Sequence, residues 1–374
     1  MPEKQLIIPE QFDPEDEYHP EPEPEPLPPA WMDGSARIGI HTSIAGGYTK
    51  ALDAAQKLGA NALQIFSASP RMWEGGPARI PESEAAAFRA RREELALGPL
   101  VIHANYLINL AAQQPMLRTR SIQAFQDELI RGIALGADYV VVHPGSCGET
   151  SMAAAISTIV ESVKQAAKRV PVGDLRILIE NTAGMGKAVG ARLEEVAELV
   201  DRLAGFGVGA CLDTAHLFAA GYDIASASAL EATLNTIDAT VGLANVPVLH
   251  VNDSKVALGG RVDRHDHLGK GKIGAAAFER LLRHPRLGTT LPEGLPGRAF
   301  ILETPIDDPG DDRKNVAALW QLAGLKDIAP EQDSSFSMMT PALKKKLAVR
   351  IAAEKKAKAQ AARLAKAKKG KTKR

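Results

Sequence analysis

The chain has 374 residues, 45% of them hydrophobic, which is enough to bury the core of one barrel-sized domain and leave additional tails. Its formal net charge is zero, but residues 1–36 hold ten acids and one base, whereas residues 341–374 hold fourteen bases and one acid. Two cysteines exclude a disulfide framework, and the sequence shows neither a secretion signal nor an apolar run of about 18 residues that could span a membrane. We therefore expect a soluble, cytoplasmic protein without a membrane partner.

The expected elements begin after an acidic, proline-rich segment. Residues 1–36 include EPEPEPLPP, a composition that predicts a disordered, flexible tail. From Ile38 onward, short apolar runs alternate with helical patterns. The expected strands are 38–43, 62–67, 100–104, 140–145, 177–182, 210–216, 248–253 and 300–305. The helical patterns between them include 48–59, 83–97, 121–136, 158–170, 192–205 and 275–285.

Eight strands with intervening helices over about 270 residues predict an α/β fold, a closed (β/α)8 TIM barrel, at residues 37–325. A doubly wound open sheet is the structural alternative, but no GxGxxG motif follows the first strand. Residues 326–342 lack periodicity and are expected to form a linker. Residues 343–374 are rich in lysine and alanine and form a basic tail, which is either solubilising or a nonspecific contact to the backbone of a nucleic acid.

Six of the eight expected strands end in a histidine or a carboxylate. These ends are LVIHA (100–104), VVVHPG (140–145), ILIENT (177–182), ACLDTAH (210–216), VLHVND (248–253) and FILETP (300–305). The carboxyl ends of the strands in a closed barrel converge, so these groups should meet at one rim. Imidazoles and carboxylates gathered in this way suit zinc and, less selectively, manganese or iron. The carboxylates Glu180, Asp213, Asp263 and Glu303 carry four negative charges, so three divalent ions would leave a net positive charge that attracts a phosphate. One or two ions would leave the site negative or neutral, which suits a sugar substrate.

Two long blocks, ACLDTAHLFAAGYD (210–223) and HVNDSKVALGGRVDRHDHLGKGKIG (250–274), resemble the endonuclease IV family of AP endonucleases. The shorter motifs HANYLINL, HPGS, IENTAG and ILET also match the family pattern. The resemblance spans about residues 38–324 and leaves out both tails. It implies a zinc-dependent enzyme of DNA repair, a monomer that hydrolyses the phosphodiester 5′ to an abasic site and leaves a 3′-hydroxyl and a 5′-deoxyribose phosphate.

The resemblance also implies three zinc ions per chain. Each of the nine family ligands has a matching residue here, namely His103, His143, Glu180, Asp213, His216, His250, Asp263, His265 and Glu303. By this resemblance Glu180 bridges two of the ions and is the catalytic carboxylate. The third ion is assigned to His216, Asp263 and His265, which requires an extended or bulged backbone between the last two residues.

The resemblance further implies three residues that enter double-stranded DNA at the abasic site, Arg71, Tyr106 and Leu107. Their alternative interpretation is structural, with Tyr106 and Leu107 covering the barrel end and Arg71 solvated. His41 matches a family histidine that is not a zinc ligand, and it is expected to support the ligands by hydrogen bonding.

Two other function classes remain open from the sequence. A metal-dependent sugar isomerase or epimerase would share the barrel and some of the ligands, but it would need only one or two metals. The additional residues His216, Asp263 and His265 argue against it. A non-enzymatic DNA-binding protein would keep the barrel as a scaffold for the basic tail, but the complete ligand set argues against that reading.

Overall fold

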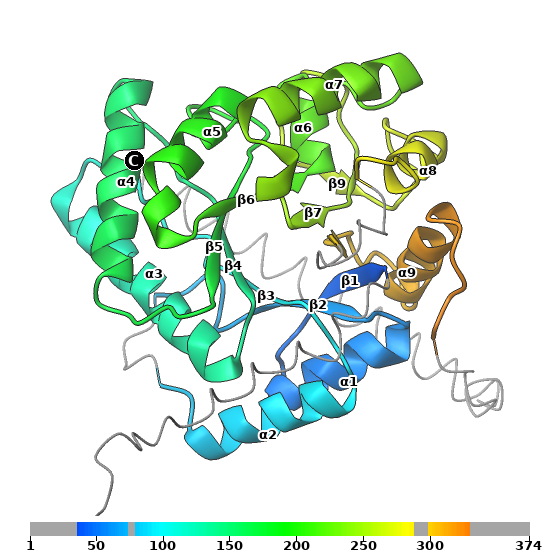
Figure 1. Cartoon of the computed structure of the whole chain (residues 1–374), viewed down its shortest axis with the longest axis horizontal. Helices are drawn as coiled ribbons and strands as arrows, with labels where there is room; N and C mark the ends of the chain where they lie inside the picture. The colour runs from blue at the N-terminus through cyan, green and yellow to red at the C-terminus, as the bar shows by residue number, and fades with distance from the viewer. Residues whose placement is uncertain (1–35, 74–78, 288–297, 330–374) are drawn as a thin grey trace, which may run out of the picture.

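The computed structural model describes residues 36–73, 79–287 and 298–329. Eight parallel strands close into a barrel in the order β1, β10, β7, β6, β5, β4, β3, β2, and helices surround it (Figure 1). The strands are β1 (Arg37–Thr42), β2 (Ala62–Phe66), β3 (Leu100–His103), β4 (Tyr139–Val142), β5 (Arg176–Glu180), β6 (Gly209–Asp213), β7 (Val248–His250) and β10 (Ala299–Leu302). The predicted (β/α)8 TIM barrel is therefore confirmed.

The strands fold into a barrel because both of their faces are apolar. In β4, Val141 belongs to a cluster of buried residues inside the barrel, whereas its neighbours Val140 and Val142 belong to the larger core under the helices. This alternation has the period of two that a strand requires. The apolar runs therefore fill the barrel and the layer around it, and polar groups are confined to the strand ends.

The outer layer is formed by helices that follow most of the strands. Their bounds are α1 (Tyr48–Leu58), α2 (Glu82–Glu94), α3 (Pro115–Leu135), α4 (Met152–Ala167), α5 (Leu193–Arg202), α6 (Thr214–Ala220), α7 (Ala227–Thr240), α8 (Ala275–Leu282) and α9 (Asp311–Leu322). Each expected helical pattern falls on one of them. Helix α3 begins six residues before the pattern at Ser121, because Pro115 can occupy the first turn, where its missing N–H costs no hydrogen bond.

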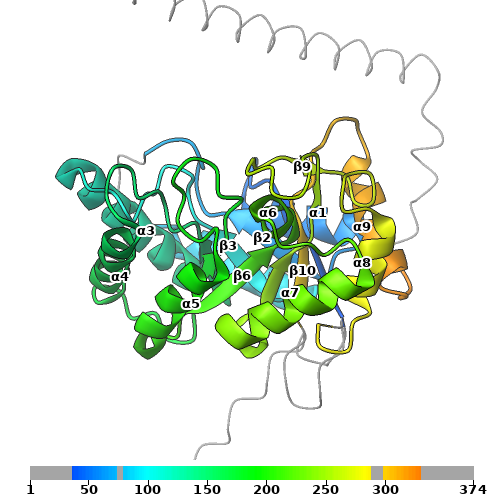
Figure 2. The same ribbon diagram turned by 90° about the horizontal axis from the view of Figure 1, so that it is seen from above.

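The loop after β7 departs from the expected strand 248–253. Strand β7 ends at His250, and a short antiparallel hairpin follows, formed by β8 (Asp253–Ser254) and β9 (His265–Asp266). Figure 2 shows β9 and the neighbouring loops at the upper edge of the barrel. His265 therefore lies on extended backbone, as its predicted pairing with Asp263 requires.

The predicted tails fall almost entirely on residues 1–35 and 330–374, which lie outside the described residues. The division into tail, linker and tail stays a prediction. Across the described ranges, we find no helix with both the length and the apolar character needed to cross a bilayer.

Candidate metal centre

The carboxyl end of the barrel gathers all nine predicted metal ligands. His103, Glu180, Asp213 and His250 are the last residues of β3, β5, β6 and β7. His143 and Glu303 directly follow β4 and β10, His216 lies in the first turn of α6, and Asp263 and His265 come from the loop and strand β9. All nine side chains therefore lie at one rim, although no two of them belong to the same barrel strand, and their role as metal ligands stays a prediction.

The nine side chains form three adjoining groups. In the first, the Nε2 atoms of His103 and His143 each lie 3.3 Å from Glu180 Oε2. In the second, His250 Nδ1 lies 3.0 Å from Glu180 Oε1 and 3.4 Å from Glu303 Oε2. Glu180 thus presents one oxygen to each group, which is the arrangement of a bridging carboxylate.

The third group lies beside the second. Asp263 places one oxygen 3.3 Å from His216 Nε2 and the other 3.3 Å from His265 Nε2. Asp213 also belongs here, since its Oδ2 lies 3.5 Å from His265 Nε2. Donor atoms of Asp213, His216 and His265 all lie within 4.8 Å of one another, and Asp213 has the same relation to Glu180, His250 and Glu303. Asp213 therefore connects the second and third groups.

Three buried atoms in the groups make no hydrogen bond of acceptable geometry, although each lies 3.3 Å from a group of opposite charge: Glu180 Oε2, His216 Nε2 and His265 Nε2. A buried polar atom without a partner is costly, so such atoms are rare in folded proteins. Divalent metal ions would satisfy these atoms, and a mixture of imidazole and carboxylate is a donor set that zinc prefers. The residues present therefore fit a metal-binding centre.

Hydrogen bonds fix the direction of the imidazole rings. Three rings place Nδ1 against a backbone carbonyl oxygen: His103 on Ala104 (2.8 Å), His216 on Asn181 (3.0 Å) and His265 on Glu303 (3.3 Å). Because a carbonyl only accepts, Nδ1 carries a proton in each ring, and Nε2 faces the centre. This arrangement selects Nε2 as the donor atom toward a metal.

His250 has the opposite orientation, because Gln64 holds its Nε2. The Oε1 atom of Gln64 lies 2.8 Å from His250 Nε2, and its Nε2 donates to Glu303 Oε1 at 2.5 Å. Gln64 also lies 3.0 Å from His41 Nδ1, and His41 in turn is 3.8 Å from Glu303. Gln64 was not among the residues predicted from the sequence to support the ligands. A glutamine inside the apolar run ALQIF was the available signal.

Two asparagines orient the carboxylates and were also missed. Asn181 accepts a hydrogen bond from the backbone N–H of Asp213 at 2.7 Å. Asn252 donates to Asp213 Oδ2 at 2.6 Å and accepts from the N–H of Glu303 at 2.8 Å. Both asparagines are buried, so these contacts fix Asp213 and Glu303 relative to each other. Asn181 directly follows Glu180, and Asn252 lies two residues after His250. Their positions next to predicted ligands were the available signal.

The electrostatics of the metal-free groups reflect the close approach of acids and imidazoles. Burial favours the neutral form of Glu180, but His143 and His250 outweigh it and hold the pKa of this carboxyl well below its usual value. Burial lowers the pKa of His216, but Asp213 and Asp263 outweigh it and raise that pKa to about 10. Without metal, His216 is therefore an imidazolium at neutral pH, and it must lose a proton before it can bind an ion.

The residues predicted to enter DNA lie at the same rim. Tyr106 is 54% exposed, and its ring centroid lies 5.5 Å from that of His103. Its backbone N–H donates to the carbonyl of Pro70, next to the exposed Arg71, at 3.2 Å. Leu107 is half-buried beside Tyr106. The loops that carry Arg71 and Tyr106 are therefore in direct contact and border the metal centre.

Asn105 holds these two loops together. Its Nδ2 donates to the carbonyls of Ser69 and Met72, both at 2.9 Å, and its Oδ1 accepts from the N–H of Leu107 at 2.7 Å. Its own N–H donates to Glu128 Oε1 at 3.2 Å. One side chain thus fixes the backbone on both sides of Arg71 and of Tyr106.

A buried ion pair on α3, Glu128 with Arg131, holds the backbone of Asn105. Glu128 and Arg131 of α3 are 2% and 5% exposed, and their charged groups approach to 3.3 Å. Ser67, at the start of the Arg71 loop, donates to Glu128 and accepts from Arg131 Nε. The network therefore connects the outer helix α3 to both loops at the rim.

The fold and the site together place the chain among the xylose isomerase-like TIM barrels, whose family model matches residues 52–322. Within that class, it is 47% identical over 294 residues to a probable endonuclease 4 of Solibacter usitatus, which covers 78% of this chain and 98% of the relative. It is 43% identical to endonuclease 4 of Thermus thermophilus, with 76% and 97% covered. The chain belongs to the endonuclease IV family.

Solved structures agree with this assignment. The crystal structure of endonuclease IV from Thermus thermophilus matches with a TM-score of 0.67 and 41% identity, covering 77% of this chain and 99% of that one. A D-tagatose 3-epimerase-like protein matches with a TM-score of 0.56 but only 17% identity, so it shares the fold alone. The AP endonuclease function predicted from the sequence is therefore confirmed at the level of the family, as a nuclease of DNA repair.

Proposed function

We propose that this enzyme hydrolyses the phosphodiester on the 5′ side of an abasic site in double-stranded DNA, leaving a 3′-hydroxyl and a 5′-deoxyribose phosphate. The observation that carries the proposal is the set of three adjoining donor groups around Glu180 and Asp213, next to the exposed Tyr106. A sugar isomerase or epimerase would have no use for the third group. We therefore set that alternative aside.

We assign three zinc ions to these groups, with manganese or iron as substitutes. His103, His143 and Glu180 would hold the first ion, and Glu180, Asp213, His250 and Glu303 would hold the second. His216, Asp263 and His265 would hold the third. Bound ions would supply Lewis acids that lower the pKa of a water molecule and neutralise charge on a phosphate.

The chain's own residues position the reacting groups. Glu180 is fully buried and lies between the first two groups, so its carboxylate is placed to orient the attacking water. Its low pKa keeps it ionised for that role. His41 and Gln64 hold Glu303 and His250 in place and touch no substrate in this proposal.

Arg71, Tyr106 and Leu107 would recognise the lesion by entering the duplex where a base is missing. The aromatic ring of Tyr106 and the apolar side chain of Leu107 can fill the gap in the base stack, and Arg71 can contact the backbone. The metal centre lies directly beside them, since Tyr106 and His103 are in ring contact. A nucleotide turned out of the stack at this point would meet the metal centre.

The predicted partner is damaged double-stranded DNA, to which the basic tail would add nonspecific contacts, and we expect a monomer. Both cysteines are free and buried, which suits the cytoplasm where we expect the enzyme to act. The decisive experiment incubates the full chain with a duplex that carries one abasic site, with and without a chelator. We expect cleavage only without chelator, with 3′-hydroxyl ends. Ends produced by β-elimination, or cleavage that survives chelation, would refute the proposal.

A further inference from the structure

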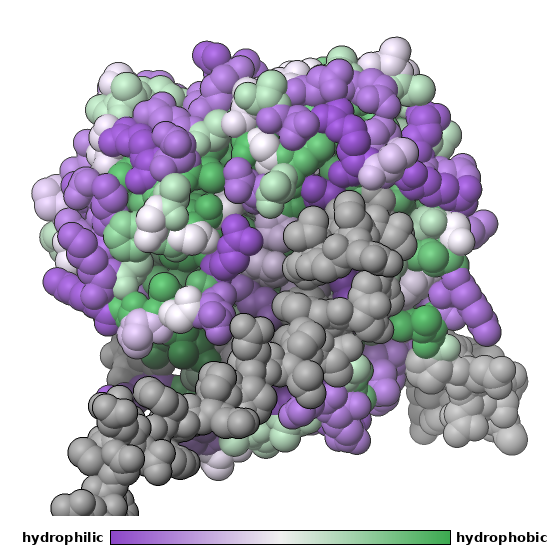
Figure 3. Space-filling model, viewed as in Figure 1, coloured by the Kyte–Doolittle hydropathy of each residue, from purple (hydrophilic) through white to green (hydrophobic). Residues whose placement is uncertain are grey.

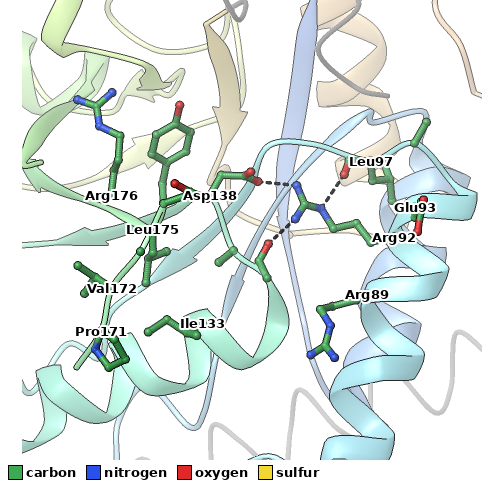
Figure 4. Close-up of a pocket in the computed structure, with 16 residues that line it drawn as sticks. Arg89, Arg92, Glu93, Leu97, Ile133, Asp138, Pro171, Val172, Leu175 and Arg176 are labelled. Carbon is green, nitrogen blue, oxygen red and sulfur yellow. Dashed lines mark hydrogen bonds and ion pairs between the residues drawn. The ribbon is translucent and has the colours of Figure 1, made fainter. Parts of the chain in front are cut away.

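A cavity of about 830 Å³ lies at the opposite end of the barrel from the metal centre (Figure 4). Its residues include Leu97, just before β3, and the first residues of β4 and β5, Tyr139 and Arg176. The strands therefore present their amino ends to this cavity, whereas the metal ligands lie at their carboxyl ends. The cavity takes no part in the proposed reaction.

The cavity has one charged wall and one apolar wall. Arg89 and Arg92 of α2 lie in the charged wall, and the apolar wall is formed by Ile133 at the end of α3 with Val172 and Leu175 before β5 (Figure 4). Three carboxylates also line the cavity, Glu93, Asp138 and Asp174, and Asp138 is paired with Arg92. Figure 3 shows hydrophobic residues at the surface in the hollow beside α3 and α4, although hydrophilic residues cover most of that face. Ile133 is 37% exposed, which is unusual for an isoleucine at the end of an otherwise well-packed helix.

Two arginines at this cavity are available to a ligand. Among the residues that the structure describes, Arg176 has no carboxylate within ion-pair distance, and its Nε makes only a long contact, 3.4 Å, to the carbonyl of Gly207. Arg89 donates through one nitrogen to the carbonyl of Ala134 and is paired through the other with Glu82, but that carboxylate is 78% exposed, and a pair so exposed contributes little stability. A ligand that combines apolar surface with carboxylates would therefore match both walls.

We propose that the cavity is the docking site of the chain's own residues 21–32, EPEPEPLPPAWM. This segment alternates glutamate with proline and then becomes apolar directly before the barrel begins. Prolines hold such a segment in the polyproline II conformation, so little conformational entropy is lost when it docks. Its glutamates fit Arg89 and Arg176, and its apolar end fits the wall at Ile133.

The segment's point of attachment supports this occupant. The carbonyl of Ala36 accepts from Asn61 Nδ2 at 2.8 Å, and the carbonyl of Asn61 accepts from the N–H of Gly98 at 2.9 Å. Gly98 adjoins Leu97 of the cavity. Two strand spacings of about 4.8 Å therefore separate Ala36 from the cavity edge, a distance of roughly 10 Å that the three residues 33–35 can span.

This distance determines where each residue of the segment would lie along the cavity. Trp31 would lie at the edge near Leu97, and Leu27 would lie about 12 Å further along, at about 3.1 Å per residue. The docked segment would also keep its acids at the far end of the barrel from the metal centre, where they cannot repel DNA. The inference is independent of the proposed reaction and concerns the binding of one part of the chain by another.

The test uses the full chain and the fluorescence of Trp31, taken as the difference between the wild type and Trp31→Phe. We expect Trp31 emission to be blue-shifted and shielded from acrylamide. Ile133→Asp and Leu27→Asp should each lower the docking equilibrium roughly tenfold or more and abolish the shielding, because each places a charge in the apolar contact. Leu27 precedes the first barrel strand in the sequence, so its replacement changes none of the barrel's described core residues.

Met116→Asp is the matched control, since Met116 is 80% exposed and lies in the first turn of the same helix α3. Shielding should persist in this variant. Quenching of wild-type Trp31 as strong as that of N-acetyltryptophanamide would overturn the proposal. Shielding that rises with protein concentration would show that Trp31 binds a second copy of the chain. Shielding that survives Ile133→Asp but is lost on deletion of residues 341–374 would show that the segment binds the lysine-rich tail instead of the cavity. Either result overturns it.

Discussion

Replacing Asn105 by alanine should weaken the recognition of abasic DNA without disturbing the metal centre. The side chain makes three hydrogen bonds, to the carbonyls of Ser69 and Met72 and to the N–H of Leu107, at 2.7–2.9 Å. At about 0.5–1.5 kcal/mol each, these bonds contribute roughly 2–4 kcal/mol to holding the two loops in one arrangement. If DNA binding must restore that order, the Kd for an abasic duplex should rise by a factor of roughly 30 to 900.

The assay is fluorescence anisotropy with a duplex that carries a tetrahydrofuran abasic analogue, with every protein in the Glu180→Gln background to prevent cleavage, together with metal analysis of each protein. Asn235→Ala is the matched control. Asn235 is an exposed asparagine on α7, and within the described residues its side chain hydrogen-bonds to Arg286 alone. We expect Asn105→Ala to keep its full metal content. An unchanged Kd, or a loss of metal that parallels the loss of affinity, would show that Asn105 does not act by holding the loops.

Three further predictions concern the metal centre and the tail. Glu180→Gln should abolish incision of an abasic duplex while sparing much of the DNA affinity, and cleavage at the wild-type rate would contradict the role of Glu180. Zinc added to metal-free enzyme at pH 8 should release protons. Burial lowers the pKa of His216, but Asp213 and Asp263 outweigh it and raise this pKa to about 10, so the ring is protonated at pH 8 and must lose a proton to bind zinc. The affinity for zinc should therefore fall as the pH falls. Calorimetry in buffers of different ionisation enthalpy measures this release, and a heat that does not depend on the buffer would argue against it. Deletion of residues 341–374 should reduce the slope of log K against log salt for DNA, and equal slopes would exclude a DNA contact by the tail.

The sequence predicted the fold and the positions of the polar residues at the strand ends for the same physical reason. A parallel barrel strand is buried on both faces, so it reads as an unbroken apolar run, and the polar residue that ends it marks the rim. His216 is a good example. Asp213 ends β6 and caps α6 by accepting from the N–H of His216 at 2.8 Å, so the spacing D-T-A-H by itself brings the two ligands together.

The supporting contacts could not be predicted, because they join residues far apart in the sequence through side-chain geometry. Gln64 meets His250 across 186 positions. The expected strand 248–253 was wrong beyond His250 for a similar reason. Asp253 turns away from the barrel because its carboxylate accepts from the backbone N–H groups of Gly271 and Ile273, which fold the loop back over the rim. No local pattern in HVND indicates those partners.

The starting point of the basic tail limits what it can do on DNA. Ala329 packs against Gly59, whose position at the end of α1 places it at the same end of the barrel as the amino ends of the strands. A Cβ at Gly59 would come within 2.8 Å of Ala329, so the approach is close. Because the described residues end at Ala329 on this side, we expect the lysines of the tail to approach a duplex at the opposite end from outside the barrel. They would then meet DNA that flanks the lesion rather than the abasic nucleotide itself. The tail should therefore strengthen binding to intact and abasic duplexes by the same factor, and its deletion should leave the ratio of the two affinities unchanged.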